Sequence, residues 1–241
     1  MSSTGAPTHA PIDALEPDAI QAALDRQGYA LIAPLVAAAE CAALAALYDA
    51  APARFRSTIT MSRYGFGRGE YKYFAYPLPA MVAALRRQMY ARLAPVANAW
   101  AARLGLATDW PAEHAALIER CRLAGQPRPT PLLLRYAAGD FNCLHQDLYG
   151  SIHFPLQAIL LLDRPGIDFD GGELVLVEQR PRRQSTAIVV PVVQGALVVI
   201  PVKERPAPSA RGFARIRVRH GVSALHRGLR RTLGLIFHDA A

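Results

Sequence analysis

Cysteine is scarce in this sequence, which has only Cys41, Cys121 and Cys143 among its 241 residues. An odd number of cysteines without the close spacing of metal ligands predicts neither a disulfide framework nor a zinc ribbon. These residues are better explained as small, partly buried thiols in a reducing compartment. We therefore expect a cytoplasmic protein.

Long hydrophobic runs are also missing. No stretch approaches the ~18 uninterrupted apolar residues that a membrane span needs, and residues 1–10 lack the basic and apolar regions of a secretory signal. We expect a soluble protein with no membrane partner. At 241 residues and 52% hydrophobic content, the chain can form one barrel-sized domain, and it does not require a second one.

Lysine is nearly absent, because Lys72 and Lys203 are the only lysines among 27 basic residues. The net charge of +8 and the pI near 9.8 are typical of proteins that bind polyanions such as nucleic acid. A composition rich in arginine and alanine gives the same charge without such a partner. The excess is concentrated in residues 180–231, where twelve basic residues stand against one acid, Glu204. A polyanion-binding surface and a solvated strand face explain this window about equally well.

Helical patterns dominate residues 1–129, which we expect to support a barrel formed by the rest of the chain. A short apolar strand is predicted over residues 28–34. Runs rich in alanine and leucine predict helices over residues 36–48, 79–104 and 112–123.

From residue 130 onward the sequence changes to short runs rich in valine, isoleucine and leucine, separated by glycine, proline and aspartate. These runs predict strands over residues 132–136, 156–162, 174–178, 188–193, 197–202, 215–220 and 229–237. Residues 206–212 are expected to form a flexible loop, because proline and small residues interrupt the strand pattern there. The prediction is an α+β fold in which residues 130–241 form a double-sheet jelly roll and the N-terminal helices pack outside it.

The best candidate for a metal site is the set His145, Asp147 and His220. His145 and Asp147 are two positions apart, so their side chains point to the same face of an extended chain. His220 shares the apolar face of its predicted strand with Ile216 and Val218, while the intervening arginines point outward. Two imidazoles and one carboxylate on one side of an ion leave coordination positions open, as Fe(II) that reacts with O₂ requires.

An arginine ten residues after His220 strengthens this interpretation. In the last predicted strand, alternation places Arg230, Thr232 and Gly234 on one face, and Leu233 and Leu235 on the other. An arginine that points inward beside a ferrous ion can bind a carboxylate through two hydrogen bonds. The distal end of 2-oxoglutarate presents such a carboxylate.

Three other histidines compete for the metal role. His153 follows the first pair, His226 lies between His220 and Arg230, and His238 is near the end of the chain. None combines an apolar-face setting with a basic residue at hairpin distance. We expect structural or supporting roles for all three, and His238 is the strongest of them because it shares the parity of Arg230.

Together, the H-x-D pair, the distant histidine followed by Gly-Val, and the arginine ten positions later resemble the Fe(II)- and 2-oxoglutarate-dependent oxygenases. A bacterial subfamily described as oxygenases acting on damaged nucleic acid is similar over much of the chain. The similar segments are FGRGEYKYFAYPLP at 66–79, RPTPLLLRY at 128–136, NCLHQDLYG at 142–150, GGELVLVEQRPR at 171–182 and RHGVS to FHDA at 219–240. The resemblance implies a double-stranded β-helix fold, Fe(II), O₂ and 2-oxoglutarate as cofactor and co-substrates, and contact of Tyr136 with 2-oxoglutarate. It also implies a dioxygenase that oxidises a C–H bond with release of succinate and CO₂, by oxidative demethylation if the substrate is damaged nucleic acid.

Several alternatives are compatible with the same residues. The enzyme could hydroxylate a small molecule or a protein at this site, or it could be a metallohydrolase that holds Zn²⁺ with the same three ligands. A non-enzymatic barrel that binds an anion would keep the fold and need no open metal position. Residues 62–79 interleave six aromatic with three basic residues, which suits stacking on bases or a lid packed on the barrel mouth.

Overall fold

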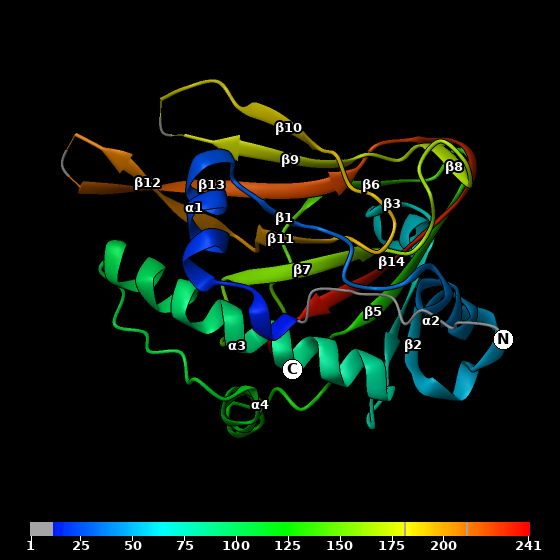
Figure 1. The fold of residues 1–241 in the computed structure, drawn as a ribbon, viewed down its shortest axis with the longest axis horizontal. Helices are drawn as coiled ribbons and strands as arrows, with labels where there is room; N and C mark the ends of the chain where they lie inside the picture. Colours follow the sequence, from blue (N-terminus) through cyan, green and yellow to red (C-terminus); the bar gives the residue numbers. More distant parts are fainter. Residues whose placement is uncertain (1–11, 181, 211) are drawn as a thin grey trace, which may run out of the picture.

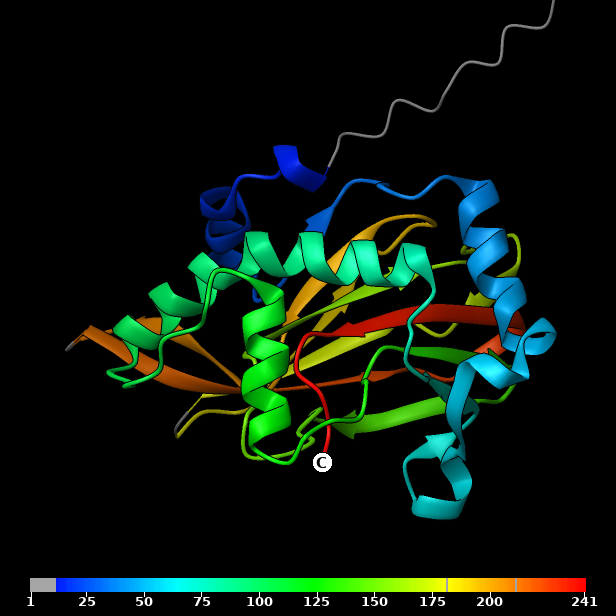
Figure 2. The ribbon, with the colours of Figure 1, turned by 90° about the horizontal axis from the view of Figure 1, so that it is seen from below.

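The computed structural model describes residues 12–180, 182–210 and 212–241, so residues 1–10, on which the signal-peptide expectation depended, lie outside it. Two antiparallel sheets face each other, and helices cover the outer side of the larger sheet (Figures 1 and 2). The helices are α1 (Pro17–Gln27), α2 (Ala38–Ala50), α3 (Ala80–Arg103) and α4 (His114–Leu123), with short 3-10 turns at Ile12–Ala14, Pro52–Arg54 and Met61–Tyr64. None of the described helices is both long and apolar enough to cross a membrane.

The larger sheet runs in the order β1-β11-β7-β14-β5-β4-β2, and β8 pairs with β14. Its strands are β1 (Ala30–Ile32), β11 (Leu197–Pro201), β7 (Leu156–Leu161), β14 (Leu225–Ile236), β5 (Leu132–Ala137), β4 (Glu70–Phe74), β2 (Phe55–Thr60) and β8 (Phe169–Gly171). The smaller sheet runs β10-β9-β13-β6-β3, and β12 pairs with β13. Its strands are β10 (Thr186–Val190), β9 (Leu174–Gln179), β13 (Gly212–Val222), β6 (Phe141–His145), β3 (Gly67–Arg68) and β12 (Glu204–Ser209).

Strand alternation divides the core into two layers. Leu233, Leu235 and Phe237 belong to the cluster that β14 shares with the helices. Between the sheets, a smaller cluster joins Leu176 and Val218 of the smaller sheet to Ile200 of the larger one. The side chains of β14 that point away from the helices therefore enter the space between the sheets, as the predicted parity requires.

Most of the predicted elements are confirmed, but the prediction for the N-terminal half is partly wrong. The region expected to be helical also contains β2, β3 and β4, and β4 pairs with β5 across the expected boundary at residue 130. β4 is only five residues long, and its alternation of charged and aromatic residues from Glu70 to Tyr73 also fits the base-stacking segment or lid expected there. The helix α1 was missed as well.

The loop expected at residues 206–212 is also wrong. Residues 204–209 form β12, which pairs with β13 in a hairpin. Arg211, which belongs to the expected loop, lies outside the described residues. Pro206 and Pro208 are tolerated there because β12 is an edge strand whose only partner is β13. A proline has no N–H group, and on the side of β12 without a neighbouring strand no inter-strand hydrogen bond is lost.

Candidate metal centre

Strand register brings the two predicted histidines together. His220 on β13 is the direct antiparallel partner of His145 at the end of β6. Paired residues of neighbouring strands project to the same face, and the two imidazole centroids lie 4.3 Å apart. The register shifts between His220 and Val222, where three steps along β6 oppose two along β13. Such bulges re-aim side chains next to functional sites.

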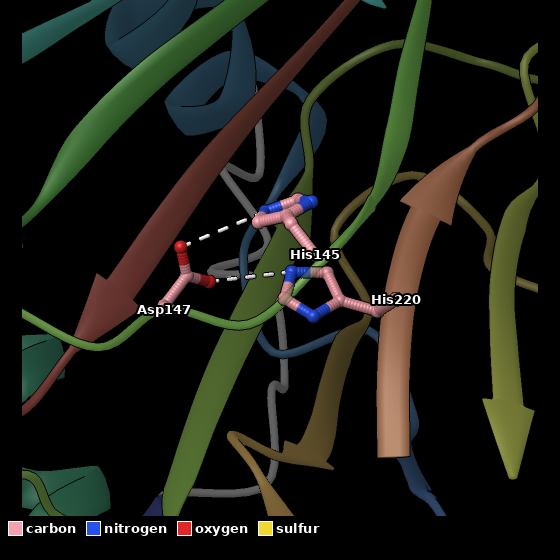
Figure 3. A group of neighbouring side chains, drawn as sticks. All are labelled: His145, Asp147 and His220. Atoms are coloured by element: carbon pink, nitrogen blue, oxygen red, sulfur yellow. Dashed lines mark ion pairs between the residues drawn. The ribbon is translucent and has the colours of Figure 1, made fainter. Parts of the chain in front are cut away.

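Asp147 completes the cluster from the chain that follows β6. Its two carboxylate oxygens face different rings: Oδ1 lies 3.6 Å from His145 Nε2, and Oδ2 lies 3.3 Å from His220 Nε2 (Figure 3). One ligand atom from each of the three residues lies within 4.8 Å of the others. The three side chains expected from the sequence are thus in one place, with two nitrogens and an oxygen available to one ion.

A carboxylate that stays ionised suits this cluster to a cation. Burial alone would raise the pKa of the Asp147 carboxyl, but its contacts with His145 and His220 hold that pKa well below the usual range. Burial, followed by the nearby His145, lowers the pKa of His220. His145 Nδ1 lies 2.8 Å from the Cys143 carbonyl, so it donates there and leaves the Nε2 lone pair for a metal.

Two residues that sequence reasoning missed hold the H-x-D segment. The Tyr149 hydroxyl donates to Asp147 Oδ1 over 2.6 Å. The Gln146 amide points the other way and donates to the carbonyls of Lys203 and Val218. Tyr149 could have been found, since it continues the alternation of His145 and Asp147. Gln146 could not, because its partners are backbone groups far along the chain.

Tyr149→Phe is expected to weaken binding of a divalent ion at this cluster by about 10- to 100-fold, the usual effect of losing a group that orients a ligand. Burial and the Asp147 carboxylate raise the pKa of Tyr149 well above its usual range, so the hydroxyl stays a donor. Titration with Mn²⁺, followed by electron paramagnetic resonance, measures the change. Tyr64→Phe is the matched control, because Tyr64 is 59% exposed and should leave affinity unchanged.

A cavity of about 310 Å³ between the sheets contains the cluster and the predicted arginine. His145, Asp147 and His220 line it from the smaller sheet and its connecting loop, and Arg230 lines it from β14 in the larger one. Arg230 is 3% exposed, and its buried Nη1 has no hydrogen-bond partner among the described residues. A guanidinium in that state needs an anion, because an unpaired buried charge is costly.

Tyr136 and Thr232 lie where the sequence predicted. Both are buried and line the cavity, and the Arg230 guanidinium carbon lies 5.7 Å from the Tyr136 ring centroid. Gly172 has a positive φ of 64°, and a Cβ there would come within 3.0 Å of Arg230 Cδ. This glycine therefore allows the backbone to pack closely on the arginine.

The competing histidines are outside the cluster. His226 is exposed and His153 is half-buried, and neither lines the cavity. His238 is fully buried, and its Nδ1 accepts a hydrogen bond from the Phe154 backbone. That bond ties the C-terminal residues to the loop that follows His145 and Asp147, which is a structural role.

The structure divides the aromatic segment at residues 62–79. Tyr73 and Phe74 are buried in β4, and Tyr71 lines the cavity. Tyr64 and Phe66 are instead 59% and 47% exposed, and their rings stack with centroids 5.5 Å apart. Gly65 and Phe66 also line the cavity, so this stacked pair lies at its mouth.

The positive charge of the basic window at residues 180–231 is partly neutralised in the folded protein. Acids from outside the window pair with three of its arginines: Glu178 with Arg205, Asp170 with Arg227, and Asp163 with Arg231. Arg215, Arg217 and Arg219 point outward from β13, as alternation predicted. The solvated strand face thus accounts for part of the excess.

Comparison with known proteins identifies one family. A family model for an oxygenase catalysing oxidative methylation of damaged DNA, Oxygenase-NA, matches residues 69–240. Uncharacterized proteins from two strains of Mycobacterium tuberculosis are 44% identical over 168 residues, which cover 70% of this chain and 72% of each relative. The residues matched by the family model include every residue of the cluster and Arg230.

Solved structures show the same fold at low sequence identity. A Pseudomonas putida prolyl-4-hydroxylase has a TM-score of 0.53 at 18% identity, covering 93% of this chain and 100% of its own. An oxidoreductase of the 2OG-Fe(II) oxygenase family from Burkholderia pseudomallei has a TM-score of 0.52 at 17% identity, covering 98% of each chain. The expected jelly-roll core with helices packed outside is confirmed.

Proposed function

Since the chain belongs to the Oxygenase-NA family, we propose that this oxygenase uses Fe(II) and 2-oxoglutarate to oxidise a C–H bond of its substrate. His145, Asp147 and His220 hold the metal, and Arg230 holds the distal carboxylate of the co-substrate. The observation that carries the proposal is Arg230, a buried arginine with a partnerless Nη1 that lines the same cavity as the three ligands.

The donor set fits Fe(II). Two imidazoles and a carboxylate that approach from one side are the facial set of non-haem iron oxygenases. Iron held there would activate O₂ and couple the oxidative decarboxylation of 2-oxoglutarate, which gives succinate and CO₂, to substrate oxidation. Tyr149 and the Cys143 carbonyl fix the orientation of Asp147 and of His145. The family match favours this chemistry over the Zn²⁺ hydrolase and the non-enzymatic barrel.

The opposite wall of the cavity fits the co-substrate. Arg230 offers a planar fork for a carboxylate, and Thr232 is the next inward side chain on β14, with a hydroxyl that can donate to the same group. The Tyr136 hydroxyl accepts a hydrogen bond from Asn142 and keeps its own proton for a ligand. The apolar walls, which include Leu134, strengthen these contacts by excluding water.

An anaerobic titration with Fe(II), with and without 2-oxoglutarate, tests the proposal. We expect 2-oxoglutarate to bind only to the metal-loaded protein and to be converted to succinate after exposure to O₂. Turnover supported by Zn²⁺ without succinate would instead indicate the hydrolase. Binding of 2-oxoglutarate without any succinate would leave an anion-binding barrel.

The substrate that the site supports best is nucleic acid with a methylated base. Oxidation of an N-methyl group gives an N-hydroxymethyl group, which releases formaldehyde and restores the base. Tyr64 and Phe66 offer exposed ring faces at the cavity mouth, and Arg63 and Arg68 beside them are exposed. Stacking of a base on an aromatic ring contributes about 1 to 3 kcal/mol. The protein and small-molecule substrates considered above would use the same iron site.

Phe66→Ala is expected to weaken binding of a methylated single-stranded oligonucleotide by about 5- to 150-fold, as loss of one stacked base predicts. Binding should also fall steeply with salt, with a slope of about −0.7 per phosphate contact for a single strand. Fluorescence anisotropy at two salt concentrations measures both effects, and Val189→Ala is the control because Val189 is exposed but lines neither the metal cavity nor its mouth.

Succinate release distinguishes catalysis on nucleic acid from electrostatic binding alone. Methylated strands should stimulate it, and unmethylated strands of the same sequence should not. Salt-sensitive binding without stimulation would show an electrostatic surface only. Absence of both effects would point to the protein or small-molecule hydroxylase.

A further inference from the structure

A second cavity, of about 410 Å³, lies on the helical side of the molecule. Trp100 and Leu104 at the end of α3, Leu106 and Trp110 in the following loop, and Ile152 beyond the metal cluster supply apolar walls. None of the residues that line this cavity also lines the cavity of His145, Asp147 and His220. It is therefore separate from the site assigned to iron and 2-oxoglutarate.

The charge of the lining selects an anion. Arg120, Lys203 and Arg215 line the cavity against a single acid, Glu204. Glu204 already pairs with Arg215 at 3.4 Å, whereas no ion pair of Lys203 or Arg120 occurs among residues 12–180, 182–210 and 212–241. Lys203 also lies near His153, where it adds to the effect of burial in lowering the pKa of that ring.

We propose that this cavity binds a small carboxylate with an apolar, aromatic or branched body. The body packs against Trp100, Trp110 and the leucines, and the carboxylate pairs with the Lys203 ammonium, which lines the same cavity. A volume of about 410 Å³ is within the range of small-molecule sites. The site depends on neither the metal nor the nucleic-acid substrate.

The chain offers its own reporter, because it contains two tryptophans and both line this cavity. Titration with 4-nitrobenzoate, an aromatic carboxylate that quenches indole fluorescence, should give saturable quenching. The neutral isostere 4-nitrobenzamide should bind at least about tenfold more weakly, since it loses the charge-assisted contact. Linear, unsaturated quenching by both compounds would mean collision with solvent-reached indoles and would overturn the proposal.

Variants locate the binding. Lys203→Met should weaken 4-nitrobenzoate binding by about tenfold. Arg217→Met is the matched charge control, because Arg217 is exposed on β13 and does not line the cavity. Melting temperatures check that each variant is folded. Weakening by Arg230→Ala with no effect of Lys203→Met would place the compound in the cavity of His145, Asp147 and His220 and refute the assignment.

Discussion

His220→Ala is expected to abolish iron-dependent succinate formation while the protein remains folded. The loss should exceed the roughly 100-fold that removal of a supporting residue costs, because His220 would be a direct ligand. Its ring lies 3.3 Å from Asp147 and is the partner of His145 in the sheet register. Succinate measured by mass spectrometry, together with Fe(II) affinity, gives the result, and circular dichroism reports the fold.

The same outcome is expected for Asp147→Ala, and the control is His226→Ala. His226 lies between His220 and Arg230 in sequence but is exposed and outside the cavity. It should retain full activity. Activity near that of the unmodified protein in His220→Ala would eliminate the metal assignment, and loss in His226→Ala would move the third ligand to the start of β14.

Strand parity was sufficient to predict much of this site. Positions 145 and 147 share a face, and β13 buries Ile216, Val218 and His220 while exposing the arginines between them. The same rule placed Arg230 and Thr232 inward on β14. Parity is reliable here because each strand buries one face, so a register error of one residue would bury charges and expose apolar groups.

Contacts that depend on tertiary structure could not be predicted in this way. The bulge between β6 and β13 depends on how two distant strands meet, and the Gln146 bonds to Lys203 and Val218 depend on the same meeting. The strands β2, β3 and β4 were missed because each is short and is held in place by its partners: β4 pairs with β5 and β2, and β3 pairs with β6. Charge was also misleading, since Asp163, Asp170 and Glu178 compensate arginines far away in sequence.

Arg230→Ala is expected to weaken the apparent affinity for 2-oxoglutarate by on the order of 30-fold to 1000-fold. Removal of a bidentate, charge-assisted contact costs about 2 to 4 kcal/mol, and Arg230 is buried with Nη1 unpartnered in the described residues. Iron affinity should not change, because the guanidinium is not a ligand. Succinate formation as a function of 2-oxoglutarate concentration, with Fe(II) binding measured in parallel, separates the two.

Arg231→Ala is the control, and it should show the opposite pattern. Arg231 points out of the cavity and binds Asp163 through two contacts of 2.6 Å and 3.1 Å. Its removal leaves the buried Asp163 carboxylate with only the backbone N–H of residue 231 as a donor, so the free energy of unfolding should fall by about 1 to 3 kcal/mol, while affinity for 2-oxoglutarate stays nearly constant. A substitution that acts through general destabilisation would affect both measurements together. Equal losses of 2-oxoglutarate affinity in Arg230→Ala and Arg231→Ala would mean that neither arginine holds the co-substrate carboxylate specifically. That result would overturn the assignment of Arg230.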